Sequence, residues 1–254
     1  MLLVPLFSAP TVVALAGAAE RRWGSSAAGW LAAFPTTLPI AVLAVAAELG
    51  DQAGSTLALS AGAHVGAQVA FAVTFALVLG RRNVLVGLAA GALAFACGSL
   101  LIGTHPAPVA AAAAIPLLAF APRLLPVRAA VAGPPRSRRD TALASLLALV
   151  LIGAVMATAK LVGPAAAGAI GAFPAMSSAL ALVIARETGA PAAAGMLRGL
   201  INGLPGYLVF CLVVTVAAPR TGTPLAVLTA AGVCLATGAL TWRAISSTRR
   251  DGSA

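Results

Sequence analysis

Two prolines, Pro35 and Pro174, each follow a phenylalanine and interrupt a long apolar segment, with hydroxyl side chains close behind. Proline has no backbone N–H to donate, and its ring clashes with the carbonyl four residues earlier. We therefore expect the carbonyls of Leu31 and Ile170 to lose their helical hydrogen-bond partners. Freed carbonyls and neighbouring hydroxyls would form a polar site for a solute or an ion; alternatively, the prolines are ordinary kinks at small-residue helix contacts. The candidate substrate-binding residues are Pro35, Thr36, Thr37, Pro174, Ser177 and Ser178, together with Arg198 and Asn202.

Three titratable side chains are candidates for proton coupling, namely Glu48, His64 and Glu187. The two glutamates end the apolar segments that contain the prolines, and a carboxylate next to hydrocarbon is a functional candidate by default. His64 lies well inside an apolar segment, and histidine titrates near neutral pH without help from its surroundings. The alternative is structural: the glutamates contact water or Arg186 at the interface, and His64 makes an interhelical hydrogen bond.

His64 belongs to a polar stripe, because residues four apart share one face of a helix. A shorter stripe of Arg198 and Asn202 lies at about the equivalent depth in the second half of the chain. Arg198 is a candidate for binding an anionic group, or else its side chain extends to the inner membrane interface. The first stripe consists of Thr56, Ser60, His64 and Gln68.

The sequence lacks the motifs of common enzyme chemistries. It has no HExxH motif, no aspartate-rich motif for a magnesium-bound diphosphate and no glycine-rich nucleotide loop after a strand. Its 6 acidic residues are too dispersed for a metal-binding cluster. Cys97, Cys211 and Cys234 lie in apolar runs without a CxxC spacing. We therefore expect no enzymatic activity, no cofactor and no metal.

Membrane-spanning helices must position these residues. The chain of 254 residues is 61% hydrophobic and 9% charged, whereas a soluble domain carries about 25% charged residues. A helix needs about 20 apolar residues to cross the hydrocarbon, and several runs reach that length. We predict an all-α, polytopic membrane helix bundle of about nine transmembrane helices. The expected spans are about 2–19, 25–47, 53–79, 83–103, 107–122, 141–159, 163–185, 190–218 and 223–242.

The basic residues, which give a net charge of +10, lie beside the ends of apolar spans rather than on one soluble face. This placement follows the positive-inside rule and argues against a nucleic-acid partner. With nine spans and the N-terminus outside, only Lys160 and Arg220 fall outside. This bias supports a span over 107–122. If that segment did not cross the membrane, every later loop would change sides, and basic residues would then fall outside. We predict a multi-pass protein of the cytoplasmic (inner) membrane with its C-terminus inside.

An internal repeat is visible in two segments that align without gaps, one starting at Trp23 and the other at Val162. The glycines, the Phe-Pro pair and the Glu-x-Gly end of each segment match at one offset. An odd number of spans separates the two halves, so they insert upside down relative to each other. We predict two inverted-topology four-helix repeats plus one linking helix. The expected parts are residues 1–122 (first repeat and linking span), 123–140 (basic cytoplasmic connector), 141–242 (second repeat) and 243–254 (cytoplasmic tail).

The repeated Gly-x4-Gly, Phe-Pro and Glu-x-Gly pattern, with an Arg-Arg-x-Gly start at Arg21, resembles small prokaryotic multi-spanning membrane proteins of unassigned function. The overall plan is similar to that of inverted-repeat secondary transporters. This resemblance implies a transporter-like architecture without implying a substrate.

Three functions fit these observations. The first is a secondary transporter or exporter of a small solute, with possible proton coupling. The second is a translocase for lipid or lipid-linked groups, in which Arg198 would meet an anionic head group. The third is a non-transporting membrane subunit that binds a partner through the basic connector. Expected partners are membrane lipid and a small solute, and the sequence leaves the oligomeric state open.

Overall fold

The computed structural model describes residues 15, 17–125, 146, 150 and 153–251, and within these ranges the regular elements are all helices. Among the described residues, six helical segments are long enough and apolar enough to cross a membrane, three of them counted through a break or a short turn. Helices suit this environment because they satisfy their own backbone hydrogen bonds where no water is present. The predicted helical membrane bundle is therefore confirmed, and the chain is a multi-pass integral membrane protein.

Several expected spans are interrupted. The span expected over 25–47 is two helices, α2 (Ser25–Ala32) and α3 (Leu38–Leu49), and the span over 163–185 is α9 (Pro164–Gly171) and α10 (Ala175–Glu187). Proline causes both breaks. The span over 53–79 is α4 (Asp51–Ala63) and α5 (Val65–Leu79), which meet at His64.

The remaining described spans are continuous. They are α6 (Val84–Ile102), α7 (Ala107–Phe120) with the short 3-10 turn η1 (Ala121–Leu124), α11 (Ala190–Thr221) and α12 (Thr223–Asp251). The segment expected at 107–122 is thus long enough to span. Residues 17–23 and 153–161 are helical, but most of the first and sixth expected spans, and the connector beyond residue 125, lie outside the described residues.

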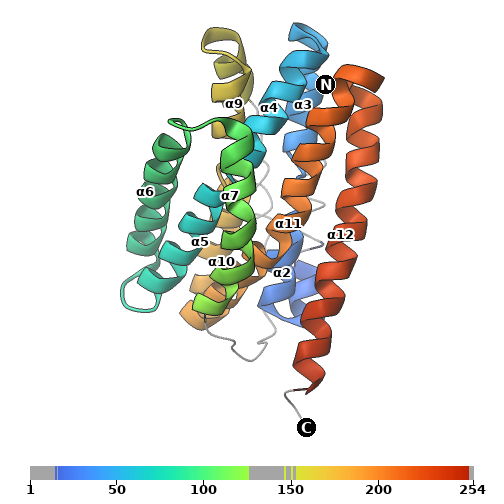
Figure 1. The fold of residues 1–254 in the computed structure, drawn as a ribbon. Coiled ribbons are helices and arrows are strands. Elements are labelled where there is room, and N and C mark those ends of the chain that lie inside the picture. The colour runs from blue at the N-terminus through green and yellow to red at the C-terminus, as the bar shows by residue number, and fades with distance from the viewer. Residues whose placement is uncertain (1–14, 16, 126–145, 147–149, 151–152, 252–254) are drawn as a thin grey trace.

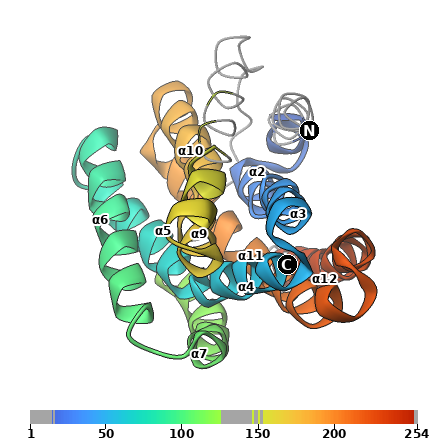
Figure 2. The same cartoon turned by 90° about the horizontal axis from the view of Figure 1, so that it is seen from above.

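The two helices that are interrupted at a proline, α2–α3 and α9–α10, run in opposite directions. In Figure 1, α2 lies low and α3 high, whereas α9 lies high and α10 low. Seen from above, α4, α5, α9 and α11 occupy the centre, with α6 at one edge and α12 at another (Figure 2). The breaks in both interrupted helices therefore fall midway between the two ends of the bundle.

Helix α2 crosses α11 at backbone contact distance. A Cβ atom added to Gly29 would lie 1.8 Å from the Met196 carbonyl oxygen, and one added to Gly199 would lie 1.9 Å from that of Ser26. The Ser26 hydroxyl donates to the Gly195 carbonyl at 3.0 Å. Small residues at a crossing permit this close packing between membrane helices.

Helix α9 crosses α4 in the same way. A Cβ atom added to Gly168 would lie 2.4 Å from the Leu57 carbonyl oxygen. The Ser60 hydroxyl donates to the Ala165 carbonyl at 2.6 Å. Each crossing thus joins a short helix from one half of the sequence to a helix from the other half, α2 to α11 and α9 to α4.

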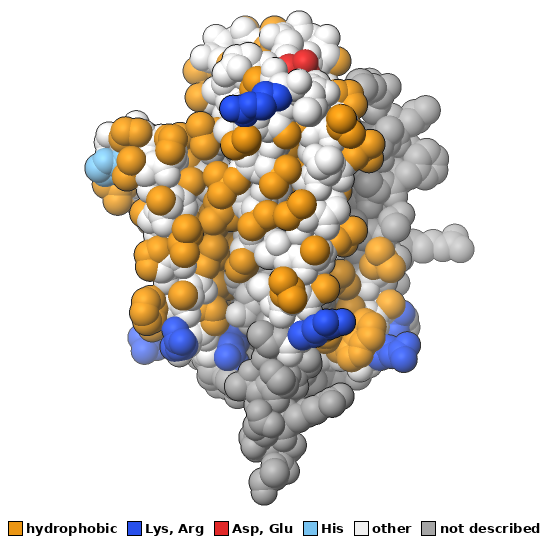
Figure 3. Space-filling model, turned by 45° about the vertical axis from the view of Figure 1, so that its right-hand side comes forward, with side chains coloured by type: hydrophobic (Ala, Val, Ile, Leu, Met, Phe, Trp, Pro, Cys, Tyr) orange, Lys and Arg blue, Asp and Glu red, His pale blue; other side chains and the backbone are white. Residues whose placement is uncertain are grey.

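Charged side chains gather at the ends of the bundle and leave an apolar band between them (Figure 3). Arginines follow or precede the helices at the lower end of Figure 1, including Arg81 and Arg82 in the turn between α5 and α6. At the upper end, Asp51 of α4 accepts hydrogen bonds from the Thr223 backbone N–H at 2.9 Å and from its hydroxyl at 2.6 Å. This contact holds the α11–α12 turn against the start of α4.

Candidate functional site

At the two Phe-Pro breaks, the backbone carbonyls form hydrogen bonds with residues close in the sequence. The carbonyls of Leu31 and Ile170 accept from the N–H groups of Phe34 and Phe173 at 3.1 and 3.0 Å. The two carbonyls thus lack the usual helical donor four residues on, which proline cannot supply, and are re-satisfied by an N–H three residues on. The chain tightens into a 3-10-type turn before each proline, which supplies a donor three residues away.

Each phenylalanine of the breaks packs against a helix of the opposite half. The Phe173 ring lies 5.3 Å from Phe95 of α6 and 6.0 Å from Phe71 of α5, in edge-to-face geometry. The Phe34 ring lies 4.9 Å from that of Trp30 and closes on Gly238 of α12, where an added Cβ atom would lie 2.5 Å from its Cζ. These contacts fix the positions of both breaks.

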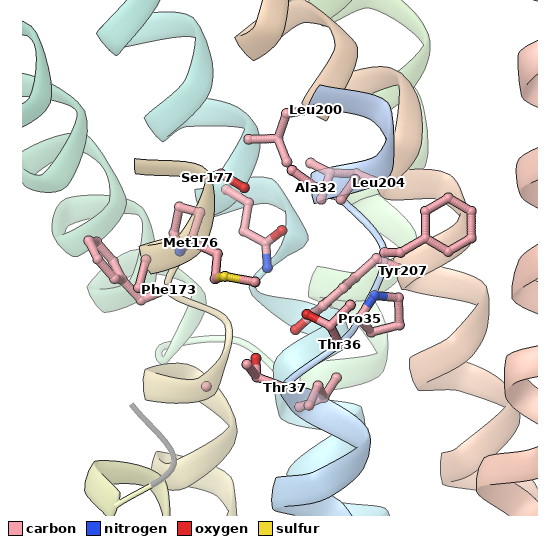
Figure 4. A pocket seen from close by; sticks show the side chains of 17 residues that line it. Ala32, Pro35, Thr36, Thr37, Phe173, Met176, Ser177, Leu200, Leu204 and Tyr207 are labelled. Atoms are coloured by element: carbon pink, nitrogen blue, oxygen red, sulfur yellow. The ribbon is translucent and has the colours of Figure 1, made fainter. Parts of the chain in front are cut away.

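Both breaks line one central cavity of about 50 Å³. Figure 4 shows Met176 and Ser177 facing Pro35, Thr36 and Thr37 across it. Its volume suffices for a few water molecules, because a single water needs roughly 10–15 Å³ by the same measure. Of the predicted site residues, the lining includes Pro35, Thr36, Thr37, Pro174 and Ser177.

Gln68 and Tyr207 add polar side chains to this cavity. The Gln68 amide nitrogen donates to the Ala172 carbonyl at 2.8 Å, so a backbone oxygen opened beside Pro174 finds its partner on α5. Sequence reasoning placed Gln68 in a polar stripe but not in the site.

Tyr207 of α11 was not predicted, although it is the single tyrosine of the chain. Its side chain is 7% exposed, and among the described residues its hydroxyl makes no hydrogen bond of good geometry. The Gln68 side chain lies beside it. The number of residues that separates Gly24 from Gly163 in the predicted repeat also separates Gln68 from Tyr207. This correspondence in the sequence could have identified Gln68 and Tyr207 as site residues.

The other predicted binding residues lie elsewhere. Ser178 is buried, and its hydroxyl donates to the Pro174 carbonyl at 2.8 Å rather than facing the cavity. Arg198 and Asn202 are half-buried on α11, and neither lines the cavity. The structure thus brings together the proline breaks but not the second polar stripe.

The three proton-coupling candidates are not adjacent. Glu48 forms an ion pair with Lys160 at 2.5 Å, with both side chains about half exposed. Glu187 is exposed at the end of α10, at the opposite end of the bundle in Figure 1. His64 is buried between α4 and α5 with Nδ1 2.7 Å from the Ser60 carbonyl, so Nδ1 carries the donated hydrogen.

His64 lines a second, lateral pocket of about 620 Å³ between α4, α6 and α9. Ser60, Ser99 and His105 contribute the other polar groups of its wall, and alanines make up much of the rest. An adjoining apolar groove of about 450 Å³ runs between α5, α6 and α7 and shares His105 and Ile102 with it. Ser60 and His64 line this lateral pocket and Gln68 lines the central cavity, so residues of the polar stripe reach both.

The described residues contain no group of three or more His, Cys, Asp or Glu side chains that could hold a metal ion. Comparison of the chain with family models, with curated protein sequences and with solved structures finds no match.

Proposed function

We propose that the chain is a secondary transporter or exporter of a small polar solute, and that the central cavity is its binding site. The observation that carries this proposal is the meeting of two Phe-Pro breaks, from distant parts of the sequence, on the walls of one cavity midway through the bundle. Interrupted helices at the bilayer midplane are how many transporters bind their substrates.

We infer that the two halves form an inverted repeat, and three observations support this part of the proposal. Gly24 and Gly163 precede the two short helices with φ of +85° and +118°, and Gly50 and Gly189 follow at the same offset with φ of +89° and +96°. The two close helix crossings are related by that offset too, since Gly29–Met196 corresponds to Gly168–Leu57. The opposite directions of α2–α3 and α9–α10 are those that an inverted pair would have.

The lining of the cavity favours a neutral or zwitterionic solute. It contains hydroxyl, amide and phenol groups but no ionisable acid or base of the Asp, Glu, Lys, Arg or His type. A solute with net charge would lie here without a counter-charge, which is costly. A zwitterion is better suited, because each break presents the carbonyl end of one helix and the N–H end of the next.

The charge distribution favours the cytoplasmic membrane with the C-terminus inside. The end of α12 that carries Arg243 is the same end that carries Arg81, Arg82 and Arg186, whereas Lys160 and Arg220 lie at the other. Basic residues concentrate on the cytoplasmic side of membrane proteins. Proton coupling through His64, Glu48 or Glu187 is an addition that the transport assay below also examines.

The test is solute flux in proteoliposomes that contain a pH-sensitive dye. The panel comprises neutral amino acids, polyols, monocarboxylates and amines, each offered with and without a pH gradient. We expect the wild-type protein to move at least one zwitterionic or neutral solute. Loss of the Tyr207 hydroxyl in Tyr207→Phe should slow that flux about tenfold, in line with one lost hydrogen bond to the solute. The matched control is Thr237→Val, which removes an exposed hydroxyl that bonds its own helix.

Tyr207→Phe is the informative variant because its hydroxyl holds no hydrogen bond of good geometry within the described structure, so folding should not depend on it. Flux unchanged in Tyr207→Phe would remove the cavity from the transport path. No movement of any solute or proton by the wild-type protein would refute the transporter proposal.

A lipid or lipid-linked-group translocase is the second candidate, and the lateral pocket beside His64 and Ser99 favours it. That pocket and its adjoining groove together offer an apolar path for acyl chains next to polar side chains. Equal loss of fluorescence from both leaflets, after adding dithionite to vesicles with labelled phospholipid, would support it. Retention of about half the fluorescence, as in protein-free vesicles, would exclude it.

A further inference from the structure

The lateral pocket between α4, α6 and α9 contains two polar side chains with unused hydrogen-bonding groups. His64 is 6% exposed, and its Nδ1–H donates to the Ser60 carbonyl at 2.7 Å. In the neutral ring Nε2 is then an acceptor, and it makes no hydrogen bond within the described part of the chain. The Ser99 hydroxyl is shielded from solvent and has no partner among the described residues either. A hydroxyl without a hydrogen bond away from water is unfavourable, so both groups favour a polar occupant.

That occupant is uncharged. His64 lies near the middle of a span, since α4 has 13 residues before it and α5 has 15 after it, or about 20 Å of helix on either side. Neither the pocket nor the adjoining groove is lined by an Asp, Glu, Lys or Arg side chain from the described ranges. A charged group would be costly at this depth, whereas a hydroxyl group can both donate to an imidazole nitrogen and accept from a serine.

An apolar chain can lie beside these groups. The groove between α5, α6 and α7 continues from the pocket at Ile102 and His105, and alanines, glycines and leucines form most of its wall. Leu100 lines the pocket and Leu101 lines the groove, and both are exposed on the outer surface of α6. Since α6 is long enough and apolar enough to span, that surface faces lipid, and molecules dissolved in the bilayer can reach both spaces.

We propose that the lateral pocket binds a membrane-soluble alcohol, that is, a long apolar chain that ends in an uncharged hydroxyl group. This hydroxyl donates to His64 Nε2 and accepts from the Ser99 hydroxyl, which turns toward it about the Cα–Cβ bond, and the chain lies in the groove between α5, α6 and α7. The site does not rest on the proposed solute transport, because the pocket and the groove share no lining residue with the central cavity. It also does not require that the alcohol cross the membrane.

The test is photolabelling in proteoliposomes, with hexadecanol that carries a diazirine in its chain and with the methyl ether of the same probe. The ether has the same chain but no hydroxyl hydrogen to donate. After irradiation, proteolysis and mass spectrometry locate the label. We expect the alcohol to label the walls of the groove about fivefold more than the ether does, which is the effect of one hydrogen bond, and an excess of unlabelled hexadecanol to compete.

Two variants separate the hydroxyl contacts from simple insertion of a chain. His64→Phe should reduce labelling by the alcohol to the level of the ether. Ser99→Ala removes a hydroxyl that bonds nothing in the described structure, so it should fold normally and also lower the labelling. The matched control is Thr229→Val on α12, which removes an exposed hydroxyl that bonds its own helix and should leave the labelling unchanged.

Far-UV circular dichroism checks that each variant is folded, and Ser99→Ala keeps the test decisive if His64→Phe is not. Equal labelling of the groove by the alcohol and the ether in the wild-type protein would overturn the proposal. Alcohol labelling that neither pocket variant lowers, or that Thr229→Val lowers equally, would overturn it as well.

Discussion

The replacement of Gly29 by alanine tests the tightest glycine contact among the residues that the structure describes. The new Cβ atom would lie 1.8 Å from the Met196 carbonyl oxygen, and real Cβ atoms essentially never come nearer than 3.0 Å to such an atom. The obstacle is helix backbone on α11, which cannot rotate away as a side chain can. Helix α2 must therefore move off α11 by more than 1 Å or tilt, and the Ser26–Gly195 hydrogen bond is lost with it.

The magnitude follows from two opposing effects. Overpacking a tight contact costs about 1–3 kcal/mol, and a clash with backbone belongs at the upper limit. Alanine is the better helix former by about 1 kcal/mol, which offsets part of this cost. The net destabilisation is about 2 kcal/mol, a factor of about 30 in the ratio of folded to unfolded protein. Gly199→Ala should behave alike, since its Cβ atom would lie 1.9 Å from the Ser26 oxygen.

The assay is equilibrium unfolding by SDS in mixed micelles, followed by circular dichroism. The control is Gly232→Ala on α12, where an added Cβ atom meets nothing within 4 Å and only the gain in helix propensity remains. Gly29→Ala should unfold at a lower SDS fraction than the wild-type protein, and Gly232→Ala at the same or a higher one. If Gly29→Ala matched Gly232→Ala, α2 and α11 would not cross at the distance described here.

Three further predictions concern polar contacts and use the same unfolding assay. Asp51→Ala should lower the unfolding midpoint, because it leaves the buried N–H and hydroxyl of Thr223 without their acceptor, and Asp51→Asn should recover part of the loss. Gln68→Leu should cost about 1–3 kcal/mol by stranding the Ala172 carbonyl, and an unchanged midpoint would mean that another donor reaches this oxygen. Glu48→Gln should lower stability by less than about 1 kcal/mol, since its ion pair is half exposed; a larger loss would show that the pair is shielded from solvent.

The parts of the fold that sequence could predict are those set by local chemistry. Hydropathy identified the spanning segments, and proline identified where two of them break, because the missing N–H acts on the nearest turn. At Leu31 and Ile170 the helical donor removed by the proline is replaced by an N–H three residues on, in a tighter turn. The interruption at His64 has no proline, only glycines two residues away on either side, and it was missed.

The site depended on distant contacts that no local pattern reports. Pro35 and Pro174 were predicted to share a site because they match across the predicted repeat, and both line the cavity. Arg198 matched the polar spacing equally well, yet it lies on a part of α11 that does not line the cavity. Tyr207 was not predicted, although its spacing from Gln68 equals the offset of the predicted repeat, and the packing of α11 places the two side chains beside each other.

The exchange of partners between the two halves has a consequence for how the protein is made. The hydroxyl of Ser26 and its acceptor on α11 are 169 residues apart in the chain. At about 5–20 residues per second, ribosomes need roughly 10–30 s to synthesise the intervening segment. During that interval α2 is already synthesised while its glycine face and its serine have no α11 to pack against. The packing of the first half of the protein is therefore completed only after the second half is synthesised. Until α11 is inserted, α2 must be accommodated by the membrane insertion machinery without its packing partner.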